Sequence, residues 1–147
     1  MKNSNKILYS VSGNIAKLTI NRPERRNALD AEALEQINIL MDRAESDENV
    51  RVILITGQGD TFSSGFDLKD QMEKAPRGKQ WKPILELDHR TIMRFWNSPK
   101  PTIAAVRGAC LAGGFELSLA CDFTICSKDS FFGEPELKFG AGIVTML

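Results

Sequence analysis

Histidine is nearly absent from this 147-residue sequence, and its scarcity excludes several kinds of catalytic site. His89 is the only histidine, so a metal site built from several histidines is excluded, and a serine-hydrolase triad has little support. The helical pattern around His89 predicts that its side chain is exposed or already has a hydrogen-bond partner.

Cysteine is also scarce. The sequence contains three cysteines, an odd number, and no C-x-x-C pair. They lie in apolar stretches, so we predict that all three are reduced, buried and behave as small hydrophobic side chains. The three are Cys110, Cys121 and Cys126.

The sequence has no excess charge of either sign and no long apolar run. Lysine plus arginine and aspartate plus glutamate both total 19, so no overall field attracts nucleic acid or an anionic membrane. No stretch reaches the roughly 18 apolar residues that a membrane span requires, and residues 1–13 lack the pattern of a secretory signal. We expect a cytoplasmic protein without nucleic-acid or membrane partners.

Two common nucleotide-binding motifs are missing. Gly57 and Gly59 follow a predicted strand, but Phe62 stands where a dinucleotide fingerprint requires its third glycine. The sequence also contains no G-x-x-x-x-G-K-[ST] segment, which argues against a P-loop.

Hydrophobic patterns predict an α/β fold in a single domain spanning residues 1–147. Apolar residues recur at helical spacing after Ala31, and Asp30 stands at the N-cap position. Two further helices are predicted at 84–96 and 115–121. The predicted strands are 7–11, 15–20, 50–56, 102–106 and 122–126, with a shorter one at 130–132.

Three segments carry weaker patterns. Charges, a glycine and two prolines predict a mobile loop at residues 71–83. Residues 109–114 are small and predict a turn. The sequence stops within the apolar run 143–147 without a terminating signal, which we interpret as a polypeptide truncated at its C-terminus.

Two glycine-containing turns follow predicted buried strands, TFSSGFD after the strand at 50–56 and LAGGFE after the strand at 102–106. Ligands of α/β sheets bind beyond the carboxyl ends of strands, where both turns are expected. Glycine lets backbone N–H groups point outward as a small anion-binding nest, so two such turns could converge on one oxygen. The alternative is that both are plain connections between a strand and a helix.

Three glutamates stand near these turns. Glu116 falls in the first turn of a predicted helix, where unpaired N–H groups favour an ionised carboxylate and hence a base. Glu134 and Glu136 flank a proline among aromatic and apolar residues that could desolvate one of them and favour its neutral form. The alternatives are helix-dipole complementarity for Glu116 and a solvated surface loop for the other two.

Four segments together resemble one family, in its order and approximate spacing. They are NRPERRNALD (21–30), TFSSGFDLKD (61–70), PTIAAVRGACLAGGFELSLACD (101–122) and FFGEPELKFGAG (131–142). They are similar to the signature segments of the crotonase, or enoyl-CoA hydratase/isomerase, family. The resemblance implies a spiral of repeated ββα units that forms trimers or pairs of trimers, with the family's C-terminal helical region absent here.

The resemblance also implies roles for particular residues. The backbone N–H groups of Phe66 and Gly113 match the oxyanion hole for a substrate thioester. Glu116 matches the glutamate that activates water for attack at C3, and Glu136 the one that supplies a proton at C2. Coenzyme A enters as part of the acyl-CoA substrate, and neither a metal nor a redox cofactor is implied. The positions expected to contact it are Arg26, Ala28, Gly65, Asp67, Leu68, Lys69 and Gly114.

The sequence therefore predicts a lyase that adds water to a trans-2-enoyl-CoA. An isomerase or another enolate-forming member of the family is the alternative enzyme, because the same oxyanion hole serves all of them. A chain that only binds acyl-CoA, or an inactive fragment, is the alternative that is not an enzyme.

Overall fold

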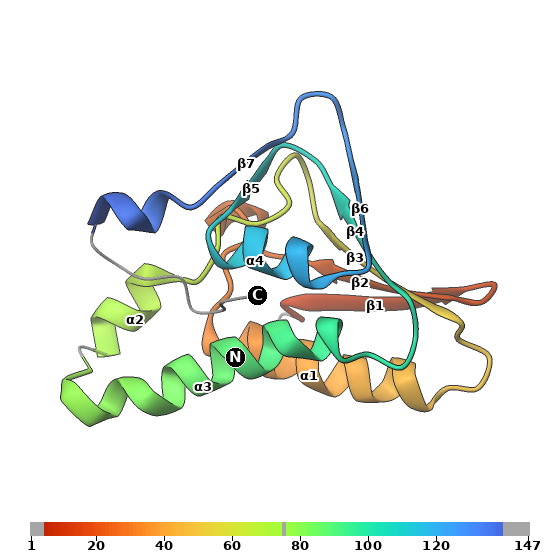
Figure 1. Cartoon of the computed structure of the whole chain (residues 1–147), viewed down its shortest axis with the longest axis horizontal. Coiled ribbons are helices and arrows are strands. Elements are labelled where there is room, and N and C mark those ends of the chain that lie inside the picture. Colours follow the sequence, from red (N-terminus) through yellow and green to blue (C-terminus); the bar gives the residue numbers. More distant parts are fainter. Residues whose placement is uncertain (1–4, 75, 140–147) are drawn as a thin grey trace.

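A five-stranded sheet forms the centre of the fold in a computed structural model of the chain, which describes residues 5–74 and 76–139 (Figure 1). The strand order is β1-β2-β3-β4-β6. The first two strands form an antiparallel hairpin, and each later strand pairs in parallel with its neighbour. The strands are β1 (Ile7–Ser12), β2 (Ile15–Ile20), β3 (Val52–Gly57), β4 (Thr102–Val106) and β6 (Phe123–Cys126).

Two long helices, α1 (Ala31–Ser46) and α3 (Trp81–Trp96), lie side by side along one side of this sheet (Figure 1). Alternate residues of β3 and β4 point into the core beneath them, because successive side chains of a strand face opposite ways. Apolar residues at three- and four-residue spacing on both helices complete the core. Its fully buried members include Ile53, Ile55, Ala104, Leu34, Ile37, Met41, Ile92 and Phe95.

A second, two-stranded parallel sheet pairs β5 (Ala109–Leu111) with β7 (Phe131–Gly133). The helix α4 (Gly113–Ala120) follows β5 directly, and a 3-10 helix (Pro135–Phe139) follows β7. β1, β2 and α1 form one ββα unit, and β4, β5 and α4 form another. The predicted α/β class with repeated ββα units is therefore confirmed.

The cap that begins α1 is confirmed in detail. The Oδ1 atom of Asp30 accepts a hydrogen bond of 2.9 Å from the amide of Ala33, which satisfies one of the N–H groups that a helix start leaves unpaired. The same carboxylate forms ion pairs of 2.6 Å with Lys6 and 3.0 Å with Arg22. The start of α1 is thus fixed by a residue that the sequence identified.

The predicted loop at residues 71–83 is wrong for most of its length. The helix α2 (Leu68–Lys74) occupies its beginning, and α3 starts at Trp81 rather than at residue 84. Pro83 falls in the first turn of α3, where it is tolerated because the N–H that proline lacks would have no acceptor within the helix. A short 3-10 helix (Gly78–Gln80) precedes α3.

Two smaller predictions are wrong. Residues 109–114 form β5 and the start of α4 rather than a turn, because residues 109–111 pair with β7. Cys110 and Cys121 are buried as predicted, but Cys126 is exposed, since β6 is exposed along its whole length. His89 is exposed, as expected. The last three residues of the segment 131–142 and the apolar run 143–147 lie outside the described residues.

No helix in the described ranges is both long and apolar enough to cross a membrane.

Candidate active site

The turn that follows β3 lies directly against the turn that leads into α4. Ser63 forms an isolated parallel bridge with Cys110, and its carbonyl accepts a 3.0 Å hydrogen bond from the amide of Leu111. Gly65, with φ of 96°, makes the close approach possible. A Cβ built on Gly65 would stand 2.6 Å from the Cβ of Ala112 and 3.1 Å from the nitrogen of Gly113, so no larger residue fits there.

The amide of Phe66 points away from its bridge partner Leu29. The amide of Leu29 donates to the carbonyl of Gly65, and the amide of Asp67 donates to the carbonyl of Leu29, both at 2.8 Å. A parallel bridge made by these flanking groups leaves the N–H of Phe66 on the opposite side. In the part of the chain that the structure describes, no backbone carbonyl accepts a hydrogen bond from this N–H.

Gly113 is the first residue of α4, so its amide has no acceptor within the helix. The N-terminus of a helix also carries the positive end of the helix dipole, which favours negative charge nearby. A Cβ built on Gly113 would lie 2.5 Å from the Cε2 atom of Phe66, so the aromatic ring packs closely on the glycine backbone. The two residues predicted to supply the oxyanion donors are therefore in contact, and they come from two separate turns.

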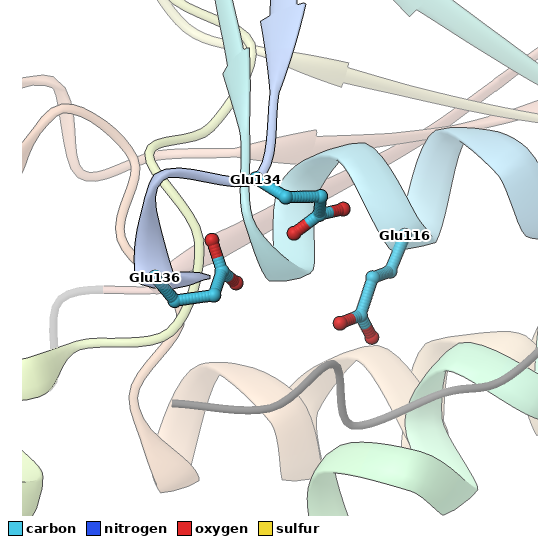
Figure 2. A group of neighbouring side chains, drawn as sticks. All are labelled: Glu116, Glu134 and Glu136. Carbon is cyan, nitrogen blue, oxygen red and sulfur yellow. The ribbon is translucent and has the colours of Figure 1, made fainter. Parts of the chain in front are cut away.

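Three glutamates converge beside this place (Figure 2). Glu116 projects from α4 and is 2% exposed, while Glu134 and Glu136 come from the segment after β7. One carboxylate oxygen from each lies within 4.8 Å of the others. This spacing would also suit a cation, but spacing alone does not identify a metal site, and we assign none.

Burial and mutual repulsion raise the pKa of Glu134 to about 8. Desolvation is the largest cause, followed by the charge of Glu136, a hydrogen bond with it, and the charge of Glu116. The Oε2 atoms of Glu134 and Glu136 are both buried and have no hydrogen-bond partner among the described residues. Glu134 therefore holds a proton more readily than an ordinary glutamate, whereas the family resemblance gave the proton-donating role to its neighbour Glu136.

Asp88 of α3 is a fourth acidic residue near the cluster, and sequence reasoning missed it. It is 2% exposed, and burial, followed by the charge of Glu116, raises its pKa to about 7. The signal was present in the sequence. Asp88, Ile92 and Phe95 stand four and then three residues apart, which places the aspartate on the buried stripe of the helix.

Most of the positions predicted to contact coenzyme A line one cavity of about 340 Å³. Phe66 lines it as well, so the cavity lies next to the predicted oxyanion donors. Its predicted members are Arg26, Ala28, Asp67 and Leu68. The sequence did not single out the other members Glu24, Arg25 and Ser64, and only their proximity in the chain to Arg26 and Gly65 could have indicated them.

The remaining predicted contact positions lie elsewhere. The exposed Lys69 lines a neighbouring cavity, with its Nζ atom 3.9 Å from a carboxylate oxygen of Glu73. Gly114 is buried against Ser63, where a built Cβ would stand 2.7 Å from the Ser63 Cβ atom. Gly114 therefore allows the two turns to pack rather than lining the cavity.

The carboxylate of Asp67 is fully engaged within the protein. Burial alone would raise its pKa, but a hydrogen bond from the amide of Asp70 and bonds from Arg25 and Arg22 outweigh burial and hold its pKa below the ordinary value. The two arginines approach to 2.9 and 3.0 Å. Asp67 thus fixes the loop of residues 22–25 against the turn, and only its backbone remains to meet a ligand.

A smaller cavity of about 150 Å³ lies between α1, α2 and α3. Leu29 lines it, and Leu29 is bridged to Phe66, which lines the larger cavity. The Leu29–Phe66 bridge therefore joins the linings of the two cavities. The other members are Asp30, Ala31, Leu34, Asp70, Pro83, Ile84, Leu87 and Asp88.

Sequence comparisons all match this chain to enoyl-CoA hydratases and isomerases. A family model described as enoyl-CoA hydratase/isomerase matches residues 10–145. A probable enoyl-CoA hydratase from Bacillus subtilis (strain 168) is 39% identical over 137 residues, which are 92% of this chain and 52% of that protein. A putative enoyl-CoA hydratase from Thermus thermophilus is 35% identical over 139 residues, covering 92% of this chain and 54% of the relative.

Solved structures agree. An enoyl-CoA hydratase/isomerase from Xanthobacter autotrophicus Py2 superimposes with a TM-score of 0.93 at 61% identity, over 95% of this chain and 52% of that one. A putative enoyl-CoA hydratase/isomerase (crotonase) from Legionella pneumophila gives a TM-score of 0.90 at 33% identity, over 96% of this chain and 56% of the other. The chain thus spans about half the length of the curated relatives it matches.

Proposed function

Since this chain belongs to the enoyl-CoA hydratase/isomerase (crotonase) family, we propose that it carries the site at which water adds to a trans-2-enoyl-CoA thioester. The observation that supports this most strongly is the close packing of Phe66 on Gly113, two residues whose amides have no backbone acceptor in the described ranges, near a cluster of glutamates. A site for water addition requires both parts, because charge develops on the thioester oxygen while protons move at the adjacent carbons.

The reaction begins when the oxygen of water forms a bond to C3 of the substrate. The electron pair of the C2–C3 double bond moves toward the thioester carbonyl, so its oxygen becomes negatively charged and enolate-like. Two fixed N–H groups stabilise that charge without reorganising, and each is worth on the order of 3 kcal/mol. The dipole of α4 adds to the same oxygen.

The glutamates handle the two protons. Glu116 accepts a proton from the attacking water, and Glu136 donates a proton to C2 as the enolate collapses to the hydrated thioester. One water molecule is consumed and no electrons are gained or lost, so the reaction requires no redox cofactor. The residues present also supply all the chemistry without a metal ion.

The two cavities accommodate the two ends of the substrate. Coenzyme A occupies the larger cavity, with Arg26 beside its anionic portion and Ala28 and Leu68 at its wall. The acyl chain occupies the cavity of about 150 Å³ beyond Leu29. Ligand pockets commonly measure roughly 300–1,000 Å³, so this small cavity favours short acyl chains.

Steady-state hydration of short and medium trans-2-enoyl-CoA thioesters tests the proposal, followed through the loss of absorbance from the conjugated thioester. Glu116→Gln and Glu136→Gln should each lower kcat by about 10²–10⁴-fold and leave ligand binding nearly unchanged. Glu48→Gln is the matched control, because Glu48 is exposed and belongs neither to the glutamate cluster nor to the lining of either cavity.

Three outcomes would contradict the proposal in different ways. Migration of the double bond of a 3-enoyl-CoA without hydration would favour an isomerase. Tight binding without turnover by the folded chain would favour an acyl-CoA-binding role. Full activity of Glu136→Gln would remove that residue from proton transfer.

A further inference from the structure

We propose that Glu134 and Glu136 share one proton, and that Glu134 is the reservoir that keeps Glu136 protonated as the acid of the reaction. The role of that proton in the reaction rests on the proposed function. The claim that the two glutamates share it rests on the positions of their carboxyl groups. Glu134 is thus a positioning residue that acts through Glu136 and does not contact the substrate.

The closeness of the two carboxyl groups is the first argument. They lie on either side of Pro135, and one oxygen of each lies within 4.8 Å of the other and of Glu116 (Figure 2). Two ionised carboxylates can only accept hydrogen bonds, so neither can satisfy the other. Placing one proton between them turns one carboxyl into a donor and relieves the repulsion.

Burial of the unsatisfied oxygen atoms is the second argument. The Oε2 atoms of Glu134 and Glu136 are inaccessible and have no partner in the described part of the chain. Among the described residues, no lysine or arginine forms an ion pair with either carboxylate. A proton is the simplest positive charge that balances the pair.

The groups that face Glu134 act in the same direction. Glu116 adds negative charge from α4, and Asp88 of α3 faces Glu116 in turn. The thiol of Cys110 on β5 is neutral, because burial first, and the charge of Glu134 in addition, raise its pKa to about 11. The raised pKa of Glu134, about 8, is consistent with a pair that keeps one proton through neutral pH.

The shared proton lets the three glutamates return to their starting protonation states after each turnover. Each turnover leaves the proton from water on Glu116 and removes one from Glu136. Glu134 lies within 4.8 Å of both, a separation that one water molecule can bridge, so it can accept the proton from Glu116 and pass it on to Glu136. The cluster then recovers its starting charge without exchanging a proton with bulk water.

Replacement of Glu134 tests the inference through the pH profile of kcat. In the wild type, the alkaline limb should have its midpoint near pH 8. In Glu134→Gln, which can donate a hydrogen bond but cannot hold an exchangeable charge, Glu136 loses its anionic neighbour, and the limb should move at least about one pH unit lower. Glu134→Asp keeps a carboxyl group and should restore the limb toward its original position.

An unchanged alkaline limb in Glu134→Gln would overturn the inference. So would an equal loss of kcat at every pH in Glu134→Gln and Glu134→Leu, because that result describes a purely structural residue. Unfolding midpoints of all variants, measured at the same pH values, separate this from loss of the fold.

A second measurement works without turnover. Carboxyl resonances of ¹³C-labelled glutamate in the whole chain should show one group that titrates near pH 8 in the wild type and disappears in Glu134→Gln. If the wild type shows this titration but hydrates no substrate, the proposed function fails and the shared proton stands. If no glutamate titrates above pH 7, the sharing is refuted whatever the activity.

Discussion

The packing of the Phe66 ring on Gly113 leaves room for hydrogen and for nothing larger. A methyl group on Gly113 would meet three atoms of the ring at 2.5–2.7 Å, so the ring or the helix start must move. We expect Gly113→Ala to lower kcat by about 10²–10³-fold, the range found for loss of an oxyanion donor. Enoyl-CoA hydration assays measure this loss.

The double variant Gly113→Ala/Phe66→Ala is the matched test of that explanation. Removing the ring opens the space into which the new methyl group points, and both amides are retained. Part of the lost activity should therefore return. Equal activity of the single and double variants would mean that the clash with Phe66 is not the cause.

Asp88 makes stability depend on pH. Its pKa rises from 3.8 to about 7 in the folded protein, so between these values the folded chain holds a proton that the unfolded chain has released. Stability then falls as pH rises through this window. Asp88→Asn should remove that slope, and its melting temperature should exceed that of the wild type at pH 8 by more than at pH 5.

The raised pKa of Glu134 also makes stability fall as pH rises. The effect of Asp88 is therefore measured by the difference in melting temperature between Asp88→Asn and the wild type at each pH. Thermal melts over this range provide it. A difference that does not change with pH would show that Asp88 is ionised in the folded protein.

Individual site residues differed in how far the sequence could locate them. Glu116 and Gly113 were identifiable because a glycine turn and an acidic first helical turn are local patterns. The raised pKa of Glu134 was not assignable, because it depends on which carboxyl becomes buried beside a group on another element. That information exists only after β7 and α4 have packed together.

At the scale of elements, the start of α1 tests how much the Asp30 cap and its ion pairs stabilise the fold. Asp30→Ala removes the hydrogen bond to the Ala33 amide and the ion pairs to Lys6 and Arg22, and should cost about 1–3 kcal/mol in the free energy of unfolding. Asp30→Asn retains a capping oxygen and loses only the charge, so it should cost less. Urea denaturation measures both, and equal losses would show that the cap contributes nothing.

Elements defined by periodicity were predictable, and elements defined by tertiary contacts were not. The strands β2 and β4 agree with their predicted bounds, because dense apolar runs bounded by turn residues are local signals. The strand β5 was predicted as a turn, since three small residues acquire strand character only by pairing with β7. Charges and prolines around α2 and the start of α3 likewise concealed short helical segments.

At the scale of the whole molecule, the parallel order of β3 and β4 is what joins the two halves of the site. Neighbouring parallel strands bring their carboxyl ends to the same edge of the sheet, and β5, which follows β4, then places the turn into α4 against the turn after β3 through the Ser63–Cys110 bridge. The sequence predicted this meeting from the glycines that follow each strand. It could not predict the two cavities, because the larger depends on how residues 24–28 meet residues 64–68 and the smaller on how α1, α2 and α3 pack.

The central claim is that the amides of Phe66 and Gly113 stabilise negative charge on a thioester oxygen. Phe66→Pro deletes one amide, and the bridge to Leu29 is retained because it uses only the flanking Gly65 and Asp67. Phe66→Ala is the matched control, since it removes the ring and keeps the amide. Both variants must first be shown to fold and to bind ligand.

The most direct measurement is the ultraviolet spectrum of a bound 3-ketoacyl-CoA, a ligand that ionises to an enolate with its own absorption band. Wild type and Phe66→Ala should both produce the enolate band at a pH where the free ligand is neutral, and Phe66→Pro should not. An enolate band of equal strength in folded, ligand-bound Phe66→Pro, or its absence in the wild type, would contradict the account.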